Sequence, residues 1–135
     1  MLHTSGELQV SHFRAPKSLL EDAAEPTVIQ VAGELHLPNA GHFQQTVQTI
    51  LSSNAGRVLL DFQQVSFLDS AGLKAVLNIR KFLSLQSRPL TLRLCPDSQP
   101  DQATRNSGLS SVMTLIYEDL LDPAAAALLD KSREV

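Results

Sequence analysis

The stretch that decides the fold is Asp61-Phe62-Gln63-Gln64-Val65-Ser66-Phe67-Leu68-Asp69-Ser70-Ala71-Gly72-Leu73-Lys74-Ala75-Val76-Leu77. Its first two residues are the end of an almost continuous apolar run over residues 57–62. Such a run is typical of a strand covered on both faces. Its second half predicts a helix from about residue 70 to about residue 86, because apolar residues recur there at helical spacing. The apolar face contains Gly72, Val76, Ile79 and Leu83, and the opposite face contains Lys74, Asn78 and Lys81. A strand that leads into a helix in this way is typical of α/β folds.

The remainder of the chain continues the alternation of strands and helices. Strands are predicted at residues 7–13, at 27–31 running into 33–37, at 90–94 and at 112–116, and helices at 40–51, 97–106 and 118–131. The order β-β-α-β-α-β-(α)-β-α predicts an α/β fold with a mixed central sheet that is parallel in its later part. The length of 135 residues suits a single domain over 1–135, with a core at about 8–117 and a C-terminal helix within 118–135.

Composition and charge argue against several classes of function. The net charge is −3 and the 11 basic residues are scattered, which disfavours a nucleic-acid-binding surface. No run reaches the roughly 18 apolar residues of a membrane span, and residues 1–10 lack the order of a signal peptide, so we expect a cytoplasmic protein. The histidines and Cys95 show no metal-ligand spacing. Without a Gly-rich phosphate loop or a nucleophile elbow at Ser70, we expect neither a cofactor nor an enzyme.

Ser70 is the residue in this stretch that is best suited to chemical modification. It stands at the predicted start of a helix that follows a buried strand, where α/β folds place their sites. Asp69 or Ser70 in that position is also an ordinary helix N-cap, and this plain structural role stays open. A phosphoryl group on Ser70 would add about −1.5 to −2 charges beside Asp69. The folded chain can carry such a charge at its surface, whereas a partner docked over the helix start would have to desolvate it. That asymmetry is what a binding switch requires.

Residues 61–77 resemble the signature of STAS domains, the family of sulfate transporters and anti-sigma-factor antagonists. Gly33-Glu34-Leu35-His36-Leu37 resembles the second signature of the family, and Ser107-Gly108-Leu109 is a third point of similarity. The resemblance covers about residues 8–117 and implies a STAS fold.

For function, the resemblance implies an anti-sigma-factor antagonist that acts by partner switching. It implies that Ser70 is phosphorylated by an anti-sigma factor, itself a serine kinase of the histidine-kinase-like ATPase type. A phosphatase of the PP2C type removes the phosphate, and the unphosphorylated protein binds the kinase and frees a sigma factor. The expected partner-binding residues are Asp69, Ala71, Gly72, Leu73, Leu77, Gly33, Glu34 and His36. The sequence leaves open whether the protein forms a homodimer.

Two residues depart from the pattern of the antagonists. Ala71 stands where a second hydroxyl residue is common, which leaves Ser70 as the acceptor in the motif. His36 replaces the usual aspartate of the second signature and exchanges an anion for a group that titrates near neutral pH. His36 and the extra segment at 14–26 keep an alternative open. In this alternative the protein is a STAS scaffold or small-ligand-binding module that is never phosphorylated.

Overall fold

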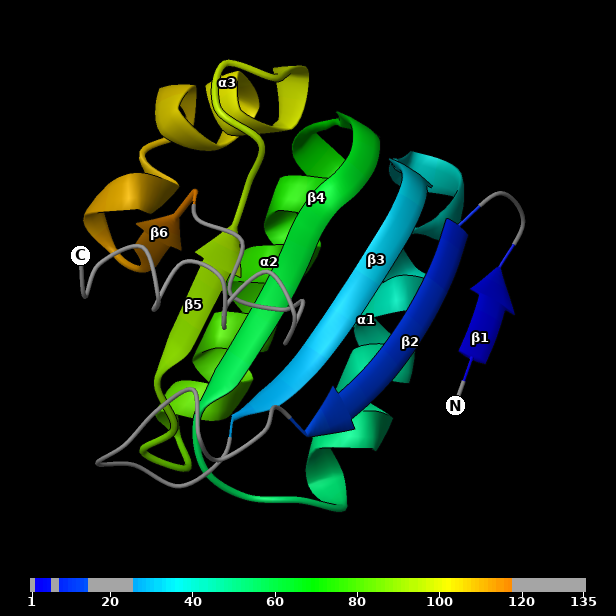
Figure 1. The fold of residues 1–135 in the computed structure, drawn as a ribbon, viewed down its shortest axis with the longest axis vertical. Helices are drawn as coiled ribbons and strands as arrows, with labels where there is room; N and C mark the ends of the chain where they lie inside the picture. The colour runs from blue at the N-terminus through cyan, green and yellow to red at the C-terminus, as the bar shows by residue number, and fades with distance from the viewer. Residues whose placement is uncertain (1, 6–7, 15–25, 118–135) are drawn as a thin grey trace, which may run out of the picture.

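Six strands form one sheet in which each strand lies beside its neighbours in the chain (Figure 1). The structure is a computed structural model that describes residues 2–5, 8–14 and 26–117. The strands are β1 (Leu2–Ser5), β2 (Leu8–Arg14), β3 (Thr27–Leu35), β4 (Val58–Leu68), β5 (Leu90–Arg93) and β6 (Thr114–Ile116). β2 pairs antiparallel with both β1 and β3, and β3 to β6 pair parallel. The mixed sheet, parallel in its later part, confirms the predicted fold class.

Two helices cover one face of this sheet. α1 (Leu37–Ser52) connects β3 to β4, and α2 (Ser70–Ser84) connects β4 to β5. Connections between neighbouring parallel strands are almost always right-handed, so two in succession place their helices on the same face. Figure 1 shows both helices behind the strands, where they contact each other. α3 (Gln99–Asn106) lies at the upper end of the sheet and contacts β4, and the short helix η2 (Leu109–Ser111) follows it.

The core fills the space between the sheet and the two helices. Phe43 on α1 and Phe62 on β4 meet edge to face, with ring centroids 6.0 Å apart. Aliphatic side chains surround this aromatic pair, and those with no exposed surface include Leu8, Ile29, Leu35, Val47, Leu51, Leu60, Val76, Ile79, Leu83 and Leu92. The apolar face predicted for α2 is buried, and Lys74 and Lys81 are exposed as predicted. Burial of this face therefore fixes the rotation of α2 about its axis.

Several element boundaries differ from the prediction. β1 was not predicted, because four residues at 2–5 are too few to show a periodicity. β4 continues through residues 63–67, beyond the apolar run at 57–62 that was predicted as a strand, because parallel pairing with β3 extends to Leu68. α1 begins at Leu37 and not at Ala40, since Pro38 occupies its first turn. β6 is limited to Thr114–Ile116. The predicted loop at 15–25 and the predicted helix at 118–131 lie outside the described residues.

β4 extends beyond β5 at the end of the sheet that leads to α2. The last β5 residue in register, Arg93, pairs with Asp61, while β4 continues to Leu68. On the other side, β3 accompanies β4 to its end, where Leu35 is in register with Leu68. The last residues of β4 therefore have a strand on one side only.

Candidate functional site

Ser70 is the first residue of α2 and is exposed. It follows Asp69, the predicted N-cap, whose Oδ1 accepts the backbone N–H of Gly72 at 2.9 Å. The side chain of Asp69 thus satisfies one of the free N–H groups that every helix presents at its start. Ser70 is left at the surface with its hydroxyl beside a bound carboxylate.

Asp69 also caps the neighbouring helix, which the sequence did not predict. Its Oδ2 accepts the backbone N–H of Leu37, the first residue of α1, at 2.9 Å. Its own N–H donates to the carbonyl of Leu35 at 3.3 Å, which ties the end of β4 to the end of β3. One carboxylate therefore lies at the N-termini of both α1 and α2, where the partial positive charge of each helix dipole stabilises an anion.

The end of β3 is shaped by a bulge at Gly33. Gly33 has φ 112°, in the region that favours glycine, and the register with β4 shifts between Gly33 and Glu34. On β4, Ser66 donates its hydroxyl to the Gly33 carbonyl at 3.4 Å. The bulge brings Glu34 into register with Phe67, which lies two residues before Asp69.

His36 occupies the N-cap position of α1 and is half-buried. Its backbone N–H donates to Oδ1 of Asn39 at 3.0 Å, and Nδ2 of Asn39 donates to the carbonyl of Glu34 at 2.8 Å. Asn39 is buried, and its amide therefore connects the end of β3 to the first turn of α1. Pro38 and Asn39 lie inside the first turn of α1, and His36 is the residue at the N-cap position.

Gly72 is required for the close approach of α2 to the sheet. A Cβ atom at this position would lie 2.6 Å from Cδ1 of Leu68 and 2.8 Å from the carbonyl oxygen of Leu35. The backbone of α2 therefore passes directly over the ends of β3 and β4. Any larger residue would push the helix start, and Ser70 with it, away from the sheet.

The structure brings most of the predicted site residues together. Gly33, Glu34, His36, Asp69, Ser70 and Gly72 gather at the carboxyl ends of β3 and β4. Ala71 and Leu73 are half-buried and pack against the core, and Leu77 is half-buried further along α2. The contacts predicted between these three residues and a partner stay predictions.

Two exposed apolar side chains lie on the helix start and the strand end that meet at the Asp69–Ser70 junction, and neither was predicted as a contact residue. Leu37 at the start of α1 is 76% exposed, and Phe67 near the end of β4 is 39% exposed. Leu37 is placed beside the junction by its bond to Asp69. Exposed apolar groups of this kind suit contact with a protein partner. Phe67 is close to Ser70 in the sequence, whereas only the tertiary structure brings Leu37 near it.

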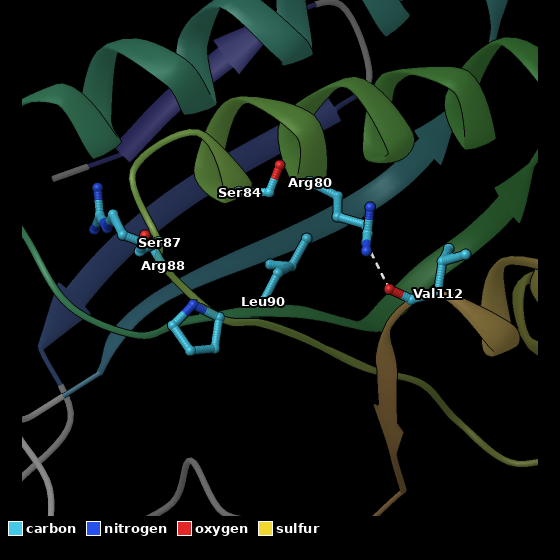
Figure 2. A pocket seen from close by; sticks show the side chains of 7 residues that line it. Arg80, Ser84, Ser87, Arg88, Leu90 and Val112 are labelled. Atoms are coloured by element: carbon cyan, nitrogen blue, oxygen red, sulfur yellow. Dashed lines mark hydrogen bonds between the residues drawn. The ribbon is translucent and has the colours of Figure 1, made fainter.

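A hollow of about 380 Å³ lies at the opposite end of the sheet, between the end of α2 and the start of β5 (Figure 2). Figure 2 shows Arg80 reaching toward the carbonyl of Val112, to which its Nε donates. The Arg88 guanidinium points away from the hollow and donates to the carbonyls of Leu51 and Gly56. Burial lowers the pKa of Arg88, and the charge of Arg14 lowers it further. Arg88 is thus a cross-link between α1 and β5.

In residues 2–5, 8–14 and 26–117, no group of three or more His, Cys, Asp or Glu side chains could hold a metal ion. No helix within these same ranges has the length and apolar character that crossing a membrane demands.

Comparison with known proteins identifies the family. The STAS domain matches residues 18–122, which is most of the chain, and the protein belongs to the STAS domain family. No curated protein matches the sequence. Among solved structures, the chain is similar to an anti-sigma factor antagonist from Mycobacterium paratuberculosis, with TM-score 0.63 and 20% identity over 87% of this chain and 92% of that one. This similarity supports the STAS fold reached from the sequence.

Two further solved structures share the fold. A putative anti-sigma factor antagonist from Thermotoga maritima has TM-score 0.61 and 20% identity, over 78% of this chain and 87% of that one. The anti-sigma factor antagonist SpoIIAA in its unphosphorylated form has TM-score 0.56 and 17% identity, over 93% of this chain and all (100%) of that one. The fold is therefore that of the anti-sigma factor antagonists.

Proposed function

We propose that the protein is a partner-switching regulator of the anti-sigma-factor-antagonist type, with Ser70 as the phosphorylated residue. The observation that carries the proposal is the position of Ser70: it is exposed, at a helix start, and next to a carboxylate that is already held by two helices. In this reading the protein is not an enzyme. It binds a partner when Ser70 is free and releases it when Ser70 carries phosphate.

The electrostatics of the junction support an off signal. Asp69 already occupies the N-terminal N–H groups of Leu37 and Gly72, so a phosphoryl group on Ser70 adds a second anion next to the first. In water this costs little, because both charges remain solvated. Under a docked partner the same pair of anions would be desolvated together, which is strongly unfavourable. Phosphorylation therefore weakens the complex without disturbing the fold.

The proposed docking surface surrounds Ser70. It consists of the ends of β3 and β4 and the first turns of α1 and α2, with Leu37 and Phe67 as exposed apolar contacts. The proposed partner is an anti-sigma factor that is a serine kinase of the histidine-kinase-like ATPase type, and a PP2C-type phosphatase resets the switch. These partners place the protein in the cytoplasm. The STAS family match and the antagonist-like fold support this part of the proposal.

A binding measurement with a charged variant tests the switch. Ser70→Asp places a permanent negative charge at the junction, and we expect it to weaken binding to the kinase by about tenfold or more. Ser110→Asp is the matched control, since Ser110 is exposed on η2 and the added charge is the same. Isothermal titration calorimetry with the purified kinase measures both. Equal affinity of Ser70→Asp and wild type would show that charge at Ser70 is not the off signal.

The second candidate function is a STAS scaffold or small-ligand-binding module that is never phosphorylated. The hollow beside Arg80 favours it, because a guanidinium above the apolar side chain of Leu90 suits a small anion with an apolar body. The two functions differ in what Ser70→Ala does in cells. The switch predicts a variant that stays in the partner-binding state, whereas the module predicts wild-type behaviour.

A further inference from the structure

The side chain of Gln99 supplies hydrogen bonds to the end of β4, beyond the point where β5 stops. Leu68 is the last residue of β4, and its backbone N–H donates to Oε1 of Gln99 at 2.8 Å. Nε2 of Gln99 donates to the carbonyl of Leu68 at 2.9 Å. The side-chain amide thus makes with Leu68 the two hydrogen bonds that a neighbouring strand would make. Without it, both backbone groups would depend on water.

The helix that carries Gln99 is itself firmly held. Ser98 caps α3 by accepting the N–H of Asp101 at 3.3 Å. The buried Asp101 carboxylate accepts the Tyr117 hydroxyl at 2.8 Å and the Asp97 N–H at 2.9 Å, and it lies 3.2 Å from Nη2 of Arg105. Because Gln99 is the first residue of α3, these contacts fix its backbone.

The chain is therefore held on both sides directly before Ser70. On the β3 side, the Asp69 N–H donates to the Leu35 carbonyl. On the open side, Gln99 holds both polar groups of Leu68. Only Asp69 lies between the clamped Leu68 and Ser70, so the direction in which the chain leaves β4 sets where the Ser70 hydroxyl points.

We propose that Gln99 is a positioning residue for Ser70, and that α3 is the element through which the sheet edge controls the phosphorylation site. The proposal rests on the proposed function for what Ser70 does, but the clamp itself is independent of it. Gln99 is exposed and belongs to no core cluster, so its loss removes two hydrogen bonds and little apolar packing. The expected effect is local to residues 68–72 and not a general loss of stability.

Amide hydrogen exchange and ¹⁵N–¹H chemical shifts of the full chain test the clamp without any partner. In Gln99→Ala we expect exchange of the Leu68 amide to rise by roughly five- to tenfold, with shifted resonances for Asp69, Ser70 and Gly72. Gln99→Glu keeps an acceptor for the Leu68 N–H and should restore most of its protection. Gln102→Ala is the control on the same helix, since the Gln102 side chain donates to the Asp97 carbonyl and its loss should leave residues 68–72 unchanged.

Wild-type exchange at Leu68 in Gln99→Ala would overturn the proposal. So would loss of Leu68 protection while Asp69, Ser70 and Gly72 stay unshifted, because Gln99 would then hold Leu68 without positioning Ser70. A thermal unfolding midpoint close to that of wild type establishes that Gln99→Ala is folded. Phosphorylation kinetics with the kinase give a second readout: Gln99→Ala should lower kcat and leave KM nearly unchanged. If wild type takes no phosphate at all, the proposed function fails, and the exchange data still decide the role of Gln99.

Discussion

Asp69 accepts the backbone N–H of Leu37 at 2.9 Å, across 32 positions of sequence. This bond joins the start of α1 to the start of α2, because the other oxygen of the same carboxylate caps α2 at Gly72. The two loops that carry the STAS motifs are therefore one structural unit. A change in the conformation of either loop can therefore alter the position of Ser70 through the side chain of Asp69.

Asp69→Ala removes both caps at once. Losing an N-cap and a second charge-assisted bond should lower the free energy of unfolding by about 1–3 kcal/mol. Asp69→Asn keeps one acceptor oxygen but turns an NH₂ group toward the other N–H, so its loss should be smaller. Urea denaturation of both variants measures the effect. Wild-type stability of Asp69→Ala would contradict the double-cap arrangement.

Gly72 and Gly41 form a matched pair of helical glycines. Gly72→Ala should lower the free energy of unfolding by about 1–3 kcal/mol, because its Cβ would overlap Leu68 and the Leu35 carbonyl. At Gly41 in α1 a Cβ meets nothing within 4 Å, so Gly41→Ala should raise stability by up to about 1 kcal/mol. Urea denaturation compares the two. Changes of the same sign would show that helix propensity, and not close packing, governs position 72.

Tyr117 offers a spectroscopic test of the contacts that hold α3. Burial raises the pKa of the Tyr117 phenol above its ordinary value, and the bond to the Asp101 carboxylate raises it further. A raised pKa in the folded state favours the neutral phenol, so this contribution to stability is complete below about pH 10 and is lost as the pH rises through the folded pKa.

The chain has a single tyrosine and no tryptophan, so tyrosinate absorbance reports on Tyr117 alone. We expect a titration midpoint above about pH 10 in wild type and a lower midpoint in Asp101→Asn. Asp97→Asn should have a smaller effect, because the Asp97 charge is the weakest cause of the shift. An unchanged midpoint in Asp101→Asn would rule out the bond between Tyr117 and Asp101 in solution.

The sequence predicted the parts of the fold that depend on periodicity. The buried face of α2, with Val76, Ile79 and Leu83, was predicted correctly, and so was the alternation of strands and helices from β2 to β6, because burial imposes a regular spacing. An N-cap at Asp69 or Ser70 was predicted for the same local reason, since capping involves residues three positions apart, and the structure has Asp69 in this role.

The remaining features depend on pairing between distant segments. The residues at 63–67 are polar enough to suggest a turn, but pairing with β3 makes them strand. Neither the Asp69–Leu37 bond nor the Gln99 clamp leaves a local pattern, because each joins residues more than 30 positions apart. The way the candidate site is assembled therefore required the structure, whereas the motif around Ser70 is visible in the sequence and the role of Ser70 stays a prediction.

The most direct test of the central claim is the intact mass of the protein after incubation with ATP and a serine kinase of the histidine-kinase-like ATPase class from the same genome. The account predicts one added phosphate on wild type and none on Ser70→Ala, with Ser66→Ala behaving as wild type. An unmodified wild-type protein, or a phosphate that persists in Ser70→Ala, would contradict it.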